Sequence, residues 1–420
     1  MKLKALIVTI IFLLQLISVS CSRGSASFAT MPYGNSNPIL TTTIQKDGIS
    51  VPNQFIIKRK GLAYLVSDQG LQQQLGITIL KSNQTFGIDL ITARPEVINQ
   101  IKSNPQIEYV EPNYIRQIDS PNISSSAPQN SGVTAQASWK INPGRNYITI
   151  GVLDTGIDLN HPDLVKKLVP GYNNVVENAR EADDNGHGTL LSGLIVGANT
   201  SMGIASLAPE CKLMPVKVLN QDGTGTDFNI IDGIVWAVEH GAKVILLPVN
   251  GTYQSKALSD ALVYAFQNNV PVVVPVGDKG QAAKYYPASE SGIIAVNALD
   301  ATGQIANFSN KIQGTSVSAY GVNRVSTFPT YNVSLKQMNS NSGYGMISGT
   351  SAAAAEVSAL MGLIFSQYPN APFSEARRIL EMSSDRLNNP AAGYGKINPV
   401  KALTLKNSNT VQANRFIRQY

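Results

Sequence analysis

Three short stretches of the sequence place an acid, an imidazole and a hydroxyl where nucleophilic catalysis could use them. VLDTGIDLNHPDL sets Asp154 at the end of an apolar run, DDNGHGTLLSG sets His187 at an expected helix start, and ISGTSAAAAEVSAL does the same for Ser351. A serine hydroxyl is a poor nucleophile without a base, and the imidazole needs a carboxylate to hold its tautomer. Backbone N–H groups at a helix start favour a developing anion. The three motifs together indicate a catalytic triad.

A fourth candidate, Asp278, follows the valine-rich stretch PVVVPVGDKG at residues 271–280. The stretch predicts a strand buried on both faces, as in a parallel sheet. Open α/β sheets place their chemistry at the carboxyl ends of such strands. A solvated loop aspartate is the alternative, and this stretch alone leaves both interpretations open.

Apolar strands alternate with helical patterns between residues 133 and about 405. Strands are expected at 147–154, 212–219, 244–249 and 272–276, and helices at 189–198, 228–241 and 256–267. This alternation predicts an α/β fold, with a parallel sheet covered by helices on both faces.

Two further segments precede this region, in keeping with a length of 420 residues that suggests more than one folding unit. Residues 51–117 contain the strand-like stretches FIIK and IEYVEP around the helical stretch EVINQIKS. They predict a small α+β unit. Residues 118–132, IDSPNISSSAPQNSG, are expected to form an exposed linker, and residues 406–420 form a C-terminal tail.

The N-terminus resembles an export signal. A basic start precedes the apolar run 5–19, which is too short to span a bilayer comfortably, so residues 1–20 are expected to be a signal peptide. Small residues precede Cys21, which looks like the lipid-accepting cysteine of a bacterial lipoprotein. The chain is therefore expected to be exported, either as a cell-envelope lipoprotein anchored to the membrane or as a freely secreted protein. Residues 21–50 would serve as a tether.

The charge balance gives no indication of a nucleic-acid partner. The net charge is +6, yet residues 131–405 carry 19 Lys and Arg against 20 Asp and Glu, a difference of −1. The excess of positive charge lies mainly toward the two ends of the chain. A near-neutral body does not predict a phosphate-binding surface.

The motifs resemble those of the subtilisin-like serine proteases (subtilases), over roughly residues 51–403. DTGIDLNHPDL, NGHGT and GTSAAAAEV are similar to the Asp, His and Ser motifs of that family, and IEYVEPN resembles the end of its inhibitory propeptide. The resemblance implies a three-layer α/β sandwich around a mostly parallel sheet, preceded by a small α+β propeptide domain at 51–117. It also implies a serine endopeptidase acting on proteins or peptides, with its own propeptide as inhibitor and a catalytic domain at 133–405. Asp154, His187 and Ser351 would form the triad.

The resemblance assigns further residues to the site. VGDKG puts Asp278 where the family has an asparagine that donates to the oxyanion, so Asp278 and the Ser351 backbone would form the oxyanion hole. An ionised aspartate has no donor, which implies a slow enzyme or one that needs a proton on this residue. The same alignment predicts a substrate groove lined by Gly223, Gly225, Asn250, Gly251, Gly277 and Lys279.

Several departures from the family pattern keep an alternative open. Asn250 replaces a glycine and Ala355 replaces a proline, so a binding or scaffolding lipoprotein on an impaired protease fold is the second interpretation. Lys279 at the pocket rim predicts a modest preference for an acidic residue before the scissile bond. The resemblance requires no cofactor. A structural Ca²⁺ is left open, because Asp163 matches a family ligand while Thr200 offers only a hydroxyl.

Overall fold

The computed structural model describes residues 43–45, 48–61, 69–119, 132–198, 201, 204–335 and 343–405. The predicted signal peptide, Cys21 and the tail at 406–420 lie outside the described residues, as do most of the predicted tether and linker. Within the described part of the chain, no helix combines the length and the apolar character needed to cross a membrane.

A seven-stranded sheet forms the centre of the catalytic part. Its order is β13-β12-β11-β10-β6-β8-β7, and every neighbouring pair is parallel. The strands are β6 (Thr149–Asp154), β7 (Tyr172–Asn173), β8 (Lys212–Lys217), β10 (Val244–Leu246), β11 (Val272–Pro275), β12 (Ile294–Leu299) and β13 (Val317–Tyr320). Side chains alternate between its two faces, so Val273 joins one core cluster while Val272 and Val274 join the other.

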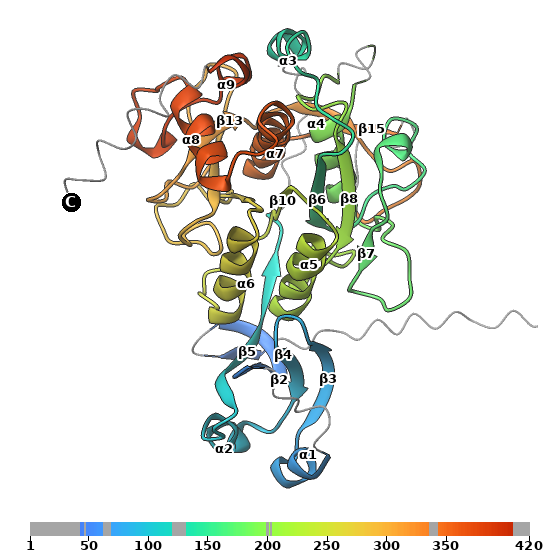
Figure 1. Cartoon of the computed structure of the whole chain (residues 1–420), viewed down its shortest axis with the longest axis vertical. Coiled ribbons are helices and arrows are strands. Elements are labelled where there is room, and N and C mark those ends of the chain that lie inside the picture. The colour runs from blue at the N-terminus through green and yellow to red at the C-terminus, as the bar shows by residue number, and fades with distance from the viewer. Residues whose placement is uncertain are drawn as a thin grey trace, which may run out of the picture. The chain divides into compact units, whose positions relative to one another are not determined.

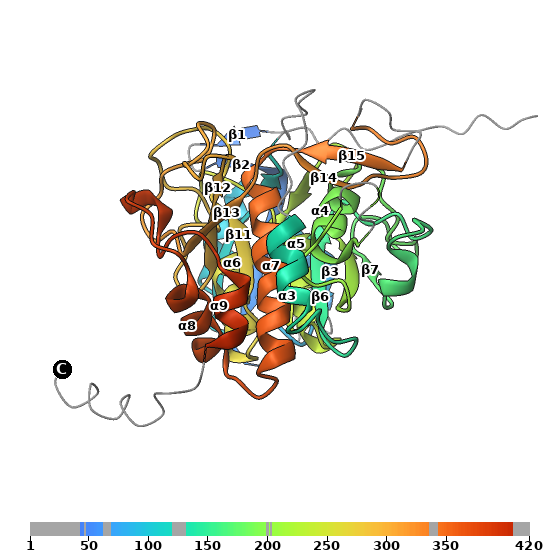
Figure 2. The ribbon, with the colours of Figure 1, turned by 90° about the horizontal axis from the view of Figure 1, so that it is seen from above.

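Helices cover both faces of this sheet and complete three layers (Figures 1 and 2). One face carries α3 (Gly132–Trp139), α4 (His187–Val196), α7 (Thr350–Gln367), α8 (Phe373–Ser383) and α9 (Pro399–Thr404), and the other carries α5 (Asp227–Glu239) and α6 (Lys256–Gln267). A hairpin of β14 (Arg324–Thr327) and β15 (Tyr344–Ile347) packs beside α4, and 3₁₀ turns lie at Val165–Lys167 and Pro390–Ala392. The predicted three-layer α/β fold is confirmed.

A second, antiparallel sheet is built from the N-terminal segment. It contains β1 (Thr43–Gln45), β2 (Gly48–Arg59), β3 (Thr78–Asn83), β4 (Ile88–Thr92) and β5 (Ile107–Gln117), with α1 (Gln69–Leu75), a 3₁₀ turn (Pro95–Val97) and α2 (Ile98–Lys102). These helices and strands pack a core of their own. One boundary was wrong: β1 and the first residues of β2 lie in the predicted tether at 21–50, where they pair with each other.

The last strand of this sheet, β5, connects the two parts. It runs out of the antiparallel sheet between α5 and α6 and pairs at its end with β9 (Thr224–Thr226) of the catalytic part (Figure 1). On the way, the Glu111 carboxylate accepts backbone N–H groups of Lys256 and Ala257, both at 2.9 Å, at the start of α6. Asn113 Oδ1 accepts the N–H of Phe228 at 3.1 Å, at the start of α5. Backbone N–H groups at the start of a helix have no partner within that helix, and here side chains of β5 accept their hydrogen bonds.

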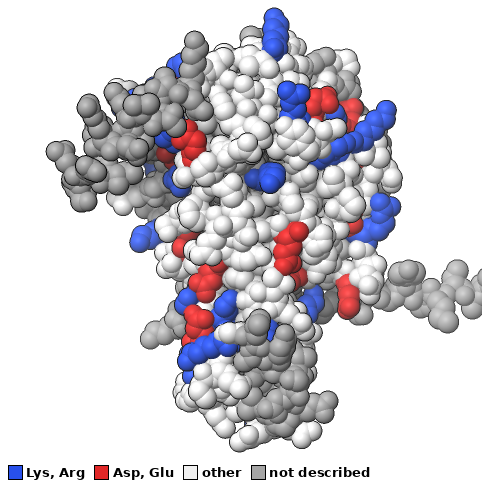
Figure 3. Space-filling view, in the orientation of Figure 1, with Lys and Arg blue, Asp and Glu red and all other residues white. Residues whose placement is uncertain are grey.

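Charged side chains are interspersed over the visible face of the described residues (Figure 3). Lys and Arg alternate there with Asp and Glu on both the catalytic part and the N-terminal sheet. This distribution agrees with the balanced charge of residues 131–405.

Candidate active site

The ends of β6 and α4 bring an acid and an imidazole together. His187 Nδ1 lies 2.8 Å from Oδ2 and 3.0 Å from Oδ1 of Asp154, and both side chains are buried. Gly188 permits this approach, because a Cβ there would lie 2.0 Å from the Gly156 carbonyl oxygen. Burial lowers the pKa of His187, but the charge and hydrogen bond of Asp154 outweigh it, so the pKa is raised above its ordinary value. The imidazole is therefore oriented and made more basic by Asp154.

The other ring nitrogen, His187 Nε2, is buried and has no hydrogen-bond partner among the residues that the structure describes. Ser351 is the second residue of α7, which packs against α4, and only 4% of its surface is exposed. No hydrogen bond joins the two side chains, and such bonds in proteases without substrate are often long or badly aligned. An unpaired Nε2 is free to accept a proton, as a general base must.

Asp278 follows β11 and faces the loop before Ser351. Its Oδ1 accepts the backbone N–H of Thr350 at 2.8 Å. The other carboxyl oxygen, Oδ2, faces Gly349, where a Cβ would lie 2.7 Å from it. Burial raises the pKa of Asp278 to about 6, although the hydrogen bonds from Thr350 lower it. Asp278 is therefore not the solvated loop aspartate that the sequence left as the alternative.

Two predicted groove glycines contact the end of β5. Gly225 lies opposite Arg116 in the β5–β9 ladder, and the Ile118 N–H donates to the Gly223 carbonyl oxygen at 3.0 Å. A Cβ on Gly223 would come within 2.6 Å of the Ile118 side chain. Glycine is therefore needed where this wall meets the incoming strand.

The opposite wall is formed by Asn250 and the loop after β11. Gln117 and Asn250 exchange two backbone hydrogen bonds of 3.2 and 2.8 Å. Asp119 follows, with Lys279 Nζ 3.4 Å from its Oδ1. Gly277 lies close by, since a Cβ there would be 3.3 Å from Asp119 Oδ2. Residues 115–119 thus lie as an extra strand between two walls of the catalytic part.

Comparison with known proteins identifies the family. The model of the subtilase family (Peptidase S8) matches residues 145–399. A thermophilic serine proteinase from Bacillus sp. (strain AK1) is 30% identical over 370 residues, which cover 85% of this chain and 88% of that protein. The chain belongs to the subtilase family. By this membership, it is a subtilisin-like serine endopeptidase.

Other relatives agree with this assignment. Thermitase from Thermoactinomyces vulgaris is 34% identical to this subtilase over 274 residues, covering 64% of this chain and 93% of thermitase. The crystal structure of fervidolysin from Fervidobacterium pennivorans, described as a keratinolytic enzyme related to subtilisin, superposes with a TM-score of 0.76 at 24% identity. That match covers 86% of this chain but 62% of fervidolysin, so this subtilase spans less than two thirds of that structure. The structural likeness supports the shared fold.

Sequence reasoning missed three residues of the groove. The predicted exposed linker began at residue 118, yet Asp119 is only 7% exposed and is held by the catalytic part. Arg116 and Asp227 were not singled out, although their side chains form a buried ion pair at 2.7 Å. Two opposite charges three residues apart in IRQID were the available signal in the sequence.

The Asp163 side chain, which the sequence singled out for Ca²⁺, is bound to a tyrosine in the structure. The Asp163 carboxylate accepts the hydroxyl of Tyr344 at 2.9 Å, and Thr200 lies outside the described residues. Among the residues that the structure describes, no three or more His, Cys, Asp or Glu side chains are grouped closely enough to hold a metal. No step of the chemistry below uses one.

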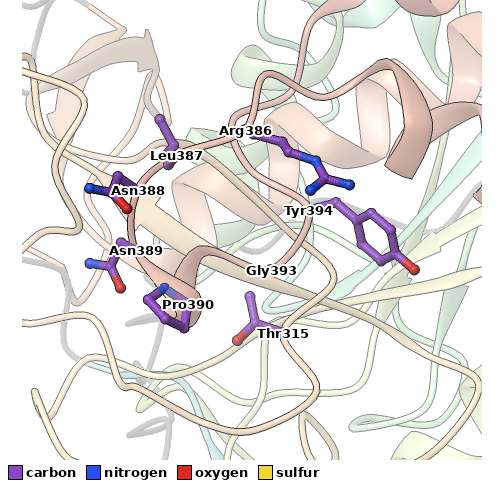
Figure 4. Close-up of a pocket in the computed structure, with 8 residues that line it drawn as sticks. All are labelled: Thr315, Arg386, Leu387, Asn388, Asn389, Pro390, Gly393 and Tyr394. Carbon is purple, nitrogen blue, oxygen red and sulfur yellow. The ribbon is translucent and has the colours of Figure 1, made fainter.

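A surface pocket of about 390 Å³ lies away from these residues (Figure 4). Arg386 and Tyr394 lie on one side of it, and Asn388 and Asn389 on the other. The remaining lining residues are Thr315, Leu387, Pro390 and Gly393. Because no lining residue is an acid or an imidazole, this pocket offers no acid–base pair like that of Asp154 and His187.

Proposed function

We propose that this subtilase is made as a self-inhibited zymogen and hydrolyses peptide bonds in proteins or peptides through Ser351, His187 and Asp154. The position of residues 115–119 is the observation that carries the proposal. They form backbone hydrogen bonds with both walls of the groove, as a peptide does when it is bound by strand addition. A chain segment in this position blocks the groove for other peptides.

The proposed reaction follows the geometry of the site. His187 Nε2 takes the proton of the Ser351 hydroxyl as the oxygen attacks the peptide carbonyl carbon, and Asp154 stabilises the imidazolium that forms. The proton then passes to the departing amine, which leaves an acyl-enzyme. Water releases the acyl group by the same route in a second step. The backbone N–H of Ser351, at the start of α7, and a protonated Asp278 would donate to the oxyanion.

The domain organisation belongs to the same proposal. Residues 51–117 act as the inhibitory propeptide and 133–405 as the catalytic domain. Glu111 and Asn113 support this assignment, because each satisfies the start of a catalytic-domain helix through a side chain of the propeptide. A scaffolding role is not favoured, since it gives the buried Asp154–His187 pair no task.

Maturation provides the direct test of the zymogen. In the Ser351→Ala variant, we expect a form that retains residues 51–117 to accumulate, because the chain can no longer cut itself. Immunoblotting and intact mass spectrometry of the variant and the wild type measure this. Identical processing of the two chains would assign the cut to another protease.

Export with a lipid anchor on Cys21 is proposed from the sequence, since these residues lie outside the described part. In a bacterial host, the wild type should incorporate radiolabelled palmitate and fractionate with membranes. Cys21→Ser should lose the label and appear in the soluble fraction. A wild type without label would indicate free secretion.

A further inference from the structure

The strand in the groove ends in two charged side chains that enter separate pockets. Arg116 and Asp119 are both buried, although charged side chains are rarely fully buried unless paired. Between them, Gln117 is exposed and Ile118 is partly exposed. Among residues 116–119, the two charged side chains are therefore the ones that are buried against the catalytic domain.

The pocket around Asp119 is built from donors. Its Oδ2 accepts Asn250 Nδ2 at 2.6 Å and the backbone N–H of Asp278 at 2.9 Å. Its Oδ1 lies 3.4 Å from Lys279 Nζ, on a lysine side chain that is 49% exposed. Among the described residues, Asn250 Oδ1 is buried without a partner, and the side chain of this asparagine hydrogen-bonds to Asp119 alone. A carboxylate satisfies these donors, and an amide of the same shape does so less well.

The pocket around Arg116 has the opposite charge. Its Nε and Nη2 donate to the two carboxylate oxygens of Asp227 at 2.7 and 3.0 Å, and Nη1 donates to the Tyr253 carbonyl oxygen at 2.7 Å. A Cβ on Gly251 would lie 2.4 Å from Nη1, so glycine is required for the guanidinium to fit. This forked geometry matches arginine and not lysine. A neutral residue here would leave the Asp227 carboxylate without its partner.

We propose that this subtilase selects peptides of the sequence Arg-x-x-Asp and cleaves on the carboxyl side of the aspartate. Asp227 recognises the arginine, while Asn250, Lys279 and the backbone of Asp278 recognise the aspartate. The proposal rests on the proposed function, because it takes residues 116–119 as the enzyme's first substrate. It also assigns a role to Asn250, because the side chain that replaces the family glycine recognises the substrate aspartate.

The bond after Asp119 is then the maturation site. N-terminal sequencing of the processed chain should find Ser120 as the first residue. Asp119→Asn and Arg116→Gln in the full chain should each slow processing by about ten-fold or more, because each leaves pocket groups unpaired. A processed chain that begins elsewhere, at an unchanged rate in both variants, would overturn the assignment.

Peptide hydrolysis by the matured wild type tests the pockets without any variant. We expect kcat/KM for a fluorogenic peptide ending in Arg-Gln-Ile-Asp to exceed that of Arg-Gln-Ile-Asn and of Gln-Gln-Ile-Asp by about ten-fold or more. The peptide Asp-Gln-Ile-Arg should be the poorest of the four. Equal rates within two-fold, or a preference for Arg or Lys before the bond, would refute the proposal.

Variants assign each preference to its pocket. Asn250→Gly, which restores the family residue, should reduce the Asp-over-Asn ratio, and Asp227→Asn should reduce the Arg-over-Gln ratio. Lys279→Gln should lower the Asp-over-Asn ratio only about two- to five-fold, with a smaller effect at high salt, because this pair is half exposed. Lys284→Gln, an exposed lysine of the same loop, is the matched control and should leave both ratios unchanged.

A fluorophosphonate separates this proposal from the one on which it rests. Labelling of Ser351 combined with equal cleavage of all four peptides leaves the protease assignment intact and removes the specificity. A matured chain that is neither labelled nor active on any peptide removes both.

Discussion

Asp278→Asn is expected to raise the rate of peptide hydrolysis at pH 8 by one to two orders of magnitude. Asparagine carries a permanent donor, whereas an aspartate donates only when protonated. With a pKa of about 6, roughly 1% of Asp278 side chains keep the proton at pH 8. Loss of one oxyanion donor costs about 100–1,000-fold in rate, so the ionised form contributes little.

The rate of hydrolysis should also depend on pH through the protonation of Asp278. In the wild type, activity needs His187 neutral and Asp278 protonated together, so the rate should peak near mildly acidic pH and fall toward neutral. The groups facing Asp278 act in opposite directions, because burial and the Asp119 carboxylate raise its pKa while Thr350 and His187 lower it. Asp278→Asn removes the alkaline fall and leaves a rate that rises with pH through the titration of His187.

Measurement of kcat/KM between pH 5 and 9 tests this. Glu239→Gln, which neutralises an exposed carboxylate at the end of α5, is the control and should follow the wild type. If Asp278→Asn leaves the rate unchanged or lowers it across the whole range, Asp278 does not act at the oxyanion.

Asp154→Asn should lower kcat by about 10³–10⁴-fold while the fold is retained. The amide would present an N–H group to His187 Nδ1, where the carboxylate now lies at 2.8 Å. Nδ1 would then have to accept, so the ring proton would move to Nε2. A protonated Nε2 cannot take the proton from Ser351.

The matched control is Asp158→Asn, in the same motif. Asp158 is buried as well, and its carboxylate binds backbone groups of Asn160 and Thr330 but not His187. It should lower thermal stability while kcat falls far less than in Asp154→Asn. Circular dichroism with single-turnover kinetics separates the two effects. Equal losses of kcat would mean that Asp154 acts through folding and not through the imidazole.

Much of the fold could be predicted because its signals are local. The strand expected at 147–154 forms at Thr149–Asp154, and the helix expected at 256–267 matches α6. Buried parallel strands are continuous apolar runs, and their helices follow within a few residues. The hairpin of β1 and β2 was missed, since its polar sequence resembles a linker and pairing decides its structure.

The site was predictable for a different reason in each part. Asp154 and His187 lie in short sequence motifs, and their roles could be predicted from those motifs directly. Asp119 lies in a stretch rich in serine and asparagine, and it is held by contacts with Asn250, Asp278 and Lys279, which are 131 or more residues away in sequence. Asp227 is the first residue of α5, where an acidic side chain is common because it interacts favourably with the helix dipole. Its position in the sequence therefore gave no indication of the ion pair with Arg116.

Two of the departures from the family pattern, Asn250 and Asp278, lie together in space, whereas Ala355 is buried inside α7. Asn250, Asp278 and Lys279 all contact Asp119 of the strand in the groove. Substitutions that only impair catalysis would not be expected to cluster around one carboxylate and supply it with hydrogen-bond donors. Their clustering favours an enzyme with changed specificity over an impaired one.

Fluorophosphonate labelling of the matured chain at pH 6 tests most directly whether Ser351 is a working nucleophile. Only a serine activated by its base reacts at an appreciable rate. We predict that peptide mapping finds the adduct on Ser351, and that His187→Ala and Ser351→Ala carry none. An unlabelled Ser351 in a correctly folded wild type whose propeptide has been removed would contradict the account.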